Sequence, residues 1–85
     1  MTHRAVPSFW TSYRRLPARI QRQADDTFDL LKQSPRHPSL HLKKVGAFWS
    51  VRIGIGWRAV ARQEDGDLYW FFIGTHAEYD KLLGR

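Results

Sequence analysis

FWSVRIGIGWRAVAR, residues 48–62, is the stretch that decides the fold. Its two halves alternate apolar and polar side chains with the period of a half-buried strand. Gly54-Ile55-Gly56 between them is typical of a three-residue hairpin turn, because glycine readily adopts the positive φ that such a loop needs. This register places Arg52 directly opposite Arg58. We therefore predict an antiparallel hairpin with one apolar face and one face that carries arginines.

Further strands are predicted on both sides of this hairpin. The alternation of Leu40 and Leu42 with polar neighbours indicates a short, half-buried strand over residues 40–43. Residues 68–73 are six apolar side chains in a row, which is typical of a central strand covered on both faces. Residues 3–6 are compatible with a short edge strand.

Helices are predicted before and after the strands. Ser8 is suited to cap a first helix, and Pro17 to begin a second one with an apolar stripe formed by Ile20, Ala24, Phe28 and Leu31. Arg22 lies on the opposite side, on a solvated face, where Asp25 and Asp26 can partner it. Thr75 followed by Glu78 is a capping box that predicts a short terminal helix. The expected fold is α+β: two N-terminal helices packed on an antiparallel sheet of three to four strands, with a short C-terminal helix.

Length and composition restrict the class of protein. The chain has 85 residues, 42% of them hydrophobic and 26% charged, which fits a single globular domain over residues 1–85. It contains no cysteine, which excludes disulfides, thiolate zinc sites and a cysteine nucleophile. No apolar run is long enough to span a bilayer and no signal-peptide region is recognisable, so we expect a cytoplasmic protein.

The net charge of +6 is unevenly distributed. Residues 1–46 hold nine Lys and Arg against three Asp, whereas residues 47–85 hold five charges of each sign. A one-sided positive field in a small domain favours nucleic acid or an acidic protein as partner.

The opposed arginines of the hairpin indicate an anion site. Like charges paired across two strands cost about 0.2–1 kcal/mol, a cost that a carboxylate such as Glu78 or Asp80 would offset. A bound phosphate would offset it equally well, because guanidinium forks match phosphate oxygens. The predicted sheet brings Arg52, Arg58 and the residue that follows the last strand, His76, to within roughly 10 Å.

Fixed cations beside a titratable histidine are suited to metal-free RNA cleavage. A base removes the proton of the ribose 2′-hydroxyl, the arginines stabilise charge on phosphorus, and an acid protonates the leaving 5′-oxygen. Tyr79, one helical turn beyond His76, reaches the same place. The alternative is structural: His76 is a surface residue at a helix start, and Tyr79 packs the helix.

The order of these elements, the Gly56-Trp57-Arg58 element and the closing residues 73–79 resemble the RelE/ParE superfamily of bacterial type II toxins over nearly the whole chain. In ribosome-dependent members, the fold implies a small mRNA interferase that cuts messenger RNA in the ribosomal A site. In ParE members, the same fold poisons DNA gyrase. The resemblance therefore implies the toxin of a type II toxin-antitoxin system, here a ribosome-dependent, metal-independent endoribonuclease without cofactors. The alternatives are a gyrase inhibitor and a non-toxic member that only binds a partner.

By position, the resemblance assigns roles to four residues. Arg58 falls on the arginine of the family's Gly-Tyr-Arg element, with Trp57 in place of the tyrosine. Arg52 lies on the strand where members place catalytic lysines, although the spacing is about one residue shorter. His76 falls where the family often has arginine or histidine, and Tyr79 resembles the C-terminal tyrosine but follows sooner. The implied roles are His76 as general acid or base, the arginines as phosphate clamps, and Tyr79 as a positioning or stacking group.

The resemblance also implies partners. They are a ribosome with its mRNA and an antitoxin that is acidic, partly disordered and equipped with a DNA-binding part. Six basic residues would then contact ribosomal RNA, which needs only charge: Lys43, Lys44, Arg14, Arg15, Arg19 and Arg22.

Overall fold

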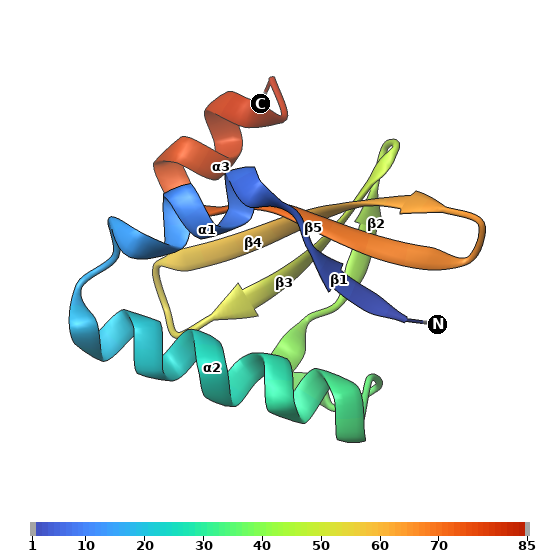
Figure 1. The fold of residues 1–85 in the computed structure, drawn as a ribbon, viewed down its shortest axis with the longest axis horizontal. Coiled ribbons are helices and arrows are strands. Elements are labelled where there is room, and N and C mark those ends of the chain that lie inside the picture. Colours follow the sequence, from blue (N-terminus) through green and yellow to red (C-terminus); the bar gives the residue numbers. More distant parts are fainter. Residues whose placement is uncertain (1, 85) are drawn as a thin grey trace.

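The computed structural model describes residues 2–84, which form one five-stranded mixed sheet and three α-helices (Figure 1). The strands are β1 (His3–Ala5), β2 (Lys43–Val45), β3 (Phe48–Ile53), β4 (Trp57–Glu64) and β5 (Asp67–Thr75). The helices are α1 (Pro7–Arg14), α2 (Ala18–Gln33) and α3 (His76–Leu82), with a 3-10 helix at Pro38–Leu40. The strand order is β1-β5-β4-β3-β2, and β1 runs parallel to β5. The α+β class is confirmed, but the sheet has five strands and is mixed.

The β3–β4 hairpin has the predicted register. Ile53 pairs with Trp57 and Arg52 with Arg58. Gly54 adopts φ +58°, the left-handed conformation that the turn requires. The apolar face of the hairpin is therefore committed to the core, and the arginines lie on the other face.

β5 is an interior strand, as predicted, but only one of its faces is buried. A β-bulge pairs Val60 with Phe72 and Ala61 with Trp70, which leaves Phe71 as the extra residue. The bulge shifts the alternation by one residue, so that both Trp70 and Ile73 are buried. The remaining aromatic side chains of the run are half-buried: Tyr69, Phe71 and Phe72.

The predicted strand over residues 40–43 is wrong at its start. Leu40 ends the 3-10 helix, and β2 begins only at Lys43. Pro38 opens the 3-10 helix, the His37 ring accepts a hydrogen bond from the Ser39 amide, and His41 closes the turn with φ +46°. These local hydrogen bonds override the alternation of the two leucines.

The helix starts also differ from the prediction. Ser8 is not an N-cap: Val6 holds that position with Pro7 as the first helical residue, and the Ser8 hydroxyl donates to the Phe71 carbonyl at 2.9 Å. Pro17 is the N-cap of α2 rather than its first residue.

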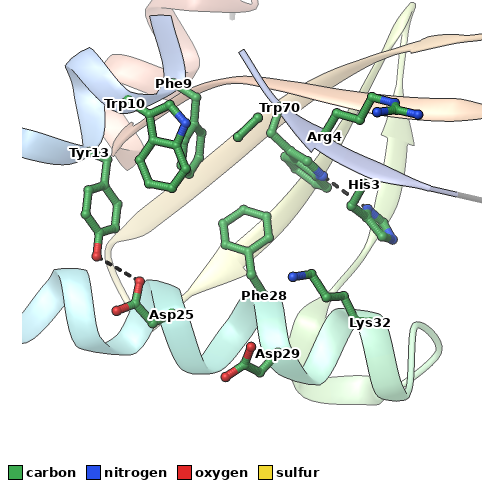
Figure 2. Close-up of a pocket in the computed structure, with 11 residues that line it drawn as sticks. His3, Arg4, Phe9, Trp10, Tyr13, Asp25, Phe28, Asp29, Lys32 and Trp70 are labelled. Atoms are coloured by element: carbon green, nitrogen blue, oxygen red, sulfur yellow. Dashed lines mark hydrogen bonds between the residues drawn. The ribbon is translucent and has the colours of Figure 1, made fainter. Parts of the chain in front are cut away.

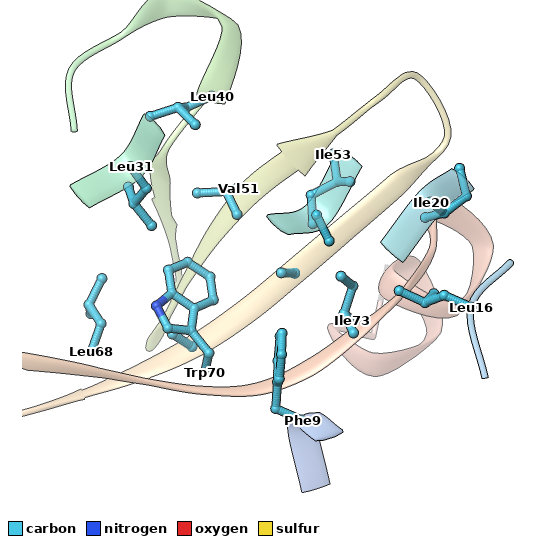
Figure 3. Packing of buried hydrophobic residues seen from close by; sticks show 13 residues of the cluster. Phe9, Leu16, Ile20, Leu31, Leu40, Val51, Ile53, Leu68, Trp70 and Ile73 are labelled. Carbon is cyan, nitrogen blue, oxygen red and sulfur yellow. The ribbon is translucent and has the colours of Figure 1, made fainter. Parts of the chain in front are cut away.

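The core lies between α2 and the sheet (Figure 3). The predicted stripe of α2 supplies the buried Ile20, Ala24 and Leu31, while Phe28 is half-buried against the same cluster. On the other side of the sheet, α3 covers only part of the face and buries Tyr79. One sheet face is thus closed by a long helix, and the arginine face is closed only partly.

Candidate active site

The two arginines of the hairpin form the cationic centre of the candidate site. Arg52 Nε donates to the Gly54 carbonyl at 3.0 Å, and Arg58 Nη1 donates to the Trp57 carbonyl at 2.9 Å. Partial burial and then the charge of Arg52 lower the pKa of Arg58, while the charges of Tyr79 and Asp80 act in the opposite direction. Within residues 2–84, no carboxylate forms an ion pair with either guanidinium. The repulsion between them is therefore not relieved by a direct salt bridge.

The start of α3 is fixed beside this pair by two sets of backbone contacts. The Thr75 hydroxyl accepts from the Glu78 amide at 3.1 Å, and Glu78 Oε1 accepts from the Thr75 amide at 2.9 Å, as the predicted capping box requires. Hydrogen bonds to the Glu78 carboxylate from the Thr75 amide, and then from the Thr75 hydroxyl at 3.0 Å, lower the pKa of Glu78. The His76 amide also donates to the Gly56 carbonyl at 2.8 Å. The first residue of α3 is thereby tied to the β3–β4 turn.

His76 is held by a carboxylate one helical turn further on. Its Nδ1 lies 3.1 Å from Asp80 Oδ2, and the two side chains are 52% and 39% exposed. A proton on Nδ1 directed at Asp80 leaves Nε2 as the nitrogen open to a substrate. Within residues 2–84, neither carboxylate considered from sequence forms an ion pair with the arginines: Asp80 holds the His76 ring and acts on Arg58 only through its charge, whereas Glu78 serves the helix cap.

Tyr79 is buried beneath this group. Its side chain is 2% exposed, its hydroxyl donates to Ser50 Oγ at 3.3 Å, and its ring centroid lies 5.8 Å from that of His76. Stacking on a base needs an exposed ring face, so this geometry suits the positioning role of Tyr79 rather than the stacking role.

The six predicted RNA contacts are exposed but do not share one surface. By register, Lys43 lies on the arginine face opposite Ser50, while Lys44 pairs with Trp49 on the other face. The remaining four lie near the α1–α2 connection: Arg14, Arg15, Arg19 and Arg22.

Two further side chains belong to the arginine face and had no role assigned from sequence. His41 Nε2 lies 3.5 Å from Arg52 Nη1, a contact that depends on the left-handed turn and leaves no sequence signal. Arg62 places its guanidinium 5.3 Å from the Tyr69 ring centroid. The position of Arg62 on this face follows from the strand period, but its contact with the ring does not.

Residues 2–84 contain neither a cluster of metal ligands nor a membrane-spanning helix. No three His, Asp or Glu side chains there are grouped so as to hold a metal ion. No helix in the same part of the chain is long and apolar enough to cross a membrane.

The architecture is that of small bacterial and archaeal toxins. The RelB–RelE antitoxin-toxin complex of Methanococcus jannaschii contains a chain that superposes with a TM-score of 0.72 at 11% identity, covering 93% of this chain and 96% of that one. The RelBE2 toxin-antitoxin complex of Mycobacterium tuberculosis gives 0.68 at 20% identity, covering 88% and 96%. A YoeB/ParE toxin from Agrobacterium tumefaciens gives 0.66 at 24% identity, covering 89% and 99%.

No family model and no curated protein matches the sequence itself. At these low identities the comparison concerns the fold: the chain has the RelE/ParE fold over most of its length, as the resemblance implied.

Proposed function

We propose that this protein is the toxin of a type II toxin-antitoxin system and acts as a ribosome-dependent, metal-independent endoribonuclease on mRNA. The RelE/ParE fold supports the toxin assignment. The observation that carries the nuclease assignment is the pairing of His76 with Asp80 beside the opposed guanidiniums of Arg52 and Arg58. A gyrase poison needs no such combination of fixed cations and a titratable imidazole.

The chemistry follows from these groups. The ribose 2′-oxygen attacks phosphorus, the bond from phosphorus to the 5′-oxygen breaks, and a 2′,3′-cyclic phosphate remains. Arg52 and Arg58 stabilise the additional negative charge on the phosphoryl oxygens. His76 Nε2 performs one of the two proton transfers, either from the 2′-hydroxyl or to the 5′-oxygen, while Asp80 holds the ring through Nδ1. Tyr79 supports the ring from below.

The partners follow from the same proposal. An acidic, partly disordered antitoxin with a DNA-binding part is expected to bind this chain of net charge +6, and several structures of this fold are antitoxin complexes. Exposed cations would contact ribosomal RNA in the cytoplasm, without base specificity: Lys43, Lys44, Arg14, Arg15, Arg19 and Arg22.

The deciding experiment is transcript-end mapping in a cell-free translation reaction. The wild-type protein is expected to produce new 5′ ends within translated codons, and His76→Ala to abolish them while keeping the same unfolding transition. Gln33→Ala, an exposed position of α2, is the control and should cleave like wild type. Intact transcripts beside inhibited DNA supercoiling would refute the nuclease and establish the ParE-like alternative.

A further inference from the structure

Cleavage of RNA by its own 2′-hydroxyl needs a base on one side of phosphorus and an acid on the other, because the attacking and leaving oxygens lie roughly in line. His76 lies on one side of the arginine pair, at the end of β5 where α3 begins. If the protein is the nuclease proposed above, a second group that transfers a proton is therefore required on the opposite side of the pair, beyond Arg52.

The surroundings of the histidines single out one of them for this place. The chain has four histidines. His3 lies on the other side of the sheet, where its Nδ1 accepts a hydrogen bond from Trp70 Nε1 at 3.1 Å (Figure 2). His37 caps the 3-10 helix, and its Nδ1 accepts from the Ser39 amide at 3.2 Å. Besides the imidazole already placed at the site, only that of His41 is left.

His41 stands at the far end of a row of residues that crosses the sheet. Gly74 of β5 pairs with Arg58, and Arg58 pairs with Arg52. Beyond Arg52, β2 has not yet begun, and His41 Nε2 lies 3.5 Å from Arg52 Nη1. The row spans three strand spacings, or roughly 14 Å of backbone, which leaves space for one phosphodiester group between its ends. The two arginines are thus flanked by an imidazole on each side.

The neighbours of the two imidazoles favour different roles. A guanidinium has only donors, so the contact of Arg52 with His41 Nε2 uses the lone pair of a neutral ring. A carboxylate has only acceptors, so His76 Nδ1, 3.1 Å from Asp80 Oδ2, carries a proton and leaves Nε2 to hold a second one for donation. Two titratable groups kept in different protonation states are the combination that acid–base catalysis requires.

The lone pair of His41 is accessible to a substrate. At 3.5 Å its contact with Arg52 is at the long limit of a hydrogen bond, and the His41 side chain is exposed. A bound phosphate attracts the Arg52 guanidinium to its oxygens, because a charged acceptor forms the stronger hydrogen bond. His41 Nε2 is then free to accept from a ribose 2′-hydroxyl.

We propose that His41 is the general base of the cleavage reaction and His76 its general acid. His41 Nε2 takes the proton of the 2′-hydroxyl, and the 2′-oxygen forms its bond to phosphorus beside the arginines. The bond from phosphorus to the 5′-oxygen breaks, and His76 Nε2 gives its proton to that oxygen. Proton exchange with water returns both imidazoles to their starting states.

A sulfur atom in place of the scissile 5′-oxygen separates the two roles, because a thiolate leaves without being protonated. Single-turnover cleavage is measured on purified ribosomes that carry either mRNA, at the position that the wild-type protein cuts. His76→Ala should lose about 100- to 10,000-fold with oxygen and regain most of this rate with sulfur. His41→Asn, which suits the left-handed turn, should lose a similar factor with both mRNAs. Gln33→Ala is the control and should match wild type with both.

The pH dependence separates proton transfer from an indirect effect through Arg52. With the sulfur mRNA, cleavage by wild type and by His76→Ala should rise between about pH 6 and 7 as the base loses its proton, whereas His41→Asn should show no rise. The other charged and titratable groups are common to all these proteins: Arg52 and Lys43 near His41, and Asp80, Tyr79 and Arg58 near His76.

The proposal is overturned if His41→Asn cleaves like wild type, or if its slower cleavage keeps the rise with pH, which would make His41 a positioning residue for Arg52. It is also overturned if sulfur restores His41→Asn rather than His76→Ala, because the two roles would then be reversed. His41→Gly, which accepts the same backbone turn, should repeat both results if the asparagine variant unfolds more easily than wild type. A wild-type protein that cuts no transcript would refute the nuclease itself, a result distinct from cleavage that does not depend on His41.

Discussion

Tyr79→Phe separates a structural from a chemical role of the phenol. The change removes the hydroxyl that donates to Ser50 Oγ at 3.3 Å, and it leaves the Ser50 hydroxyl, 1% exposed, without this partner. Stranding a buried polar group costs about 1–3 kcal/mol, and the length of this hydrogen bond places the cost near 1 kcal/mol. In a domain of this size, that loss lowers Tm by about 4–8 °C.

Ser50→Ala should cost a similar amount, because it strands the phenol instead. The double variant should cost about 1 kcal/mol rather than about 2, since it leaves neither hydroxyl unpartnered. Urea unfolding of the four proteins measures this coupling, provided that the slope with denaturant concentration is unchanged. Strictly additive costs would refute the hydrogen bond as the reason for the burial of Tyr79.

The same four proteins give a functional result. If Tyr79 only positions α3, the double variant should cleave transcripts at a rate close to that of wild type. General acid–base catalysis is worth about 100- to 10,000-fold. A loss of that size in both Tyr79 variants, with Ser50→Ala fully active, would show that the phenol itself transfers a proton.

Three further predictions concern Thr75, His3 and Gly74. Thr75→Ala removes the cap that fixes α3, so it should lower the free energy of unfolding by about 1 kcal/mol and reduce cleavage. Thr75→Ser keeps the capping hydroxyl and should restore the stability in urea unfolding and the activity in a cleavage assay. Burial is the main cause that lowers the pKa of His3 below 6.5. The unfolded chain therefore binds a proton more readily than the folded one, and the free energy of unfolding should fall as the pH drops below 6.5. His3→Gln should flatten this part of the pH dependence measured by urea unfolding. A Cβ on Gly74 would lie 2.7 Å from a ring carbon of Phe72, so Gly74→Ala should cost about 1–3 kcal/mol in thermal unfolding, whereas Gly56→Ala, with open space around it, should cost much less.

The parts of the fold that the sequence predicted correctly depend on local signals. The β3–β4 register follows from Gly54 and the alternation of the two strands next to the turn, and the α3 cap follows from Thr75 and Glu78 at the required spacing. In each case, residues a few positions apart are sufficient to specify the geometry. The opposition of Arg52 and Arg58 was predictable for the same reason.

The parts that could not be predicted depend on contacts between distant segments. The extra residue Phe71 carries no local mark, yet it decides which aromatic side chains of β5 face the core. The parallel pairing of β1 joins segments more than sixty residues apart. At the site, the position along α3 determines the contacts: Asp80 lies four residues after His76 and contacts its ring, whereas the Glu78 carboxylate is held by Thr75 in the helix cap.

β5 connects the core with the candidate site. Trp70 is buried in the core, and four residues later Gly74 pairs with Arg58 next to the start of α3. In a regular strand, residues four positions apart lie on the same face of the sheet. The bulge that leaves Phe71 as the extra residue shifts this alternation by one residue, so that Trp70 faces the core while Gly74 lies on the arginine face. The bulge therefore allows one strand to contribute both to the core and to the surroundings of the site.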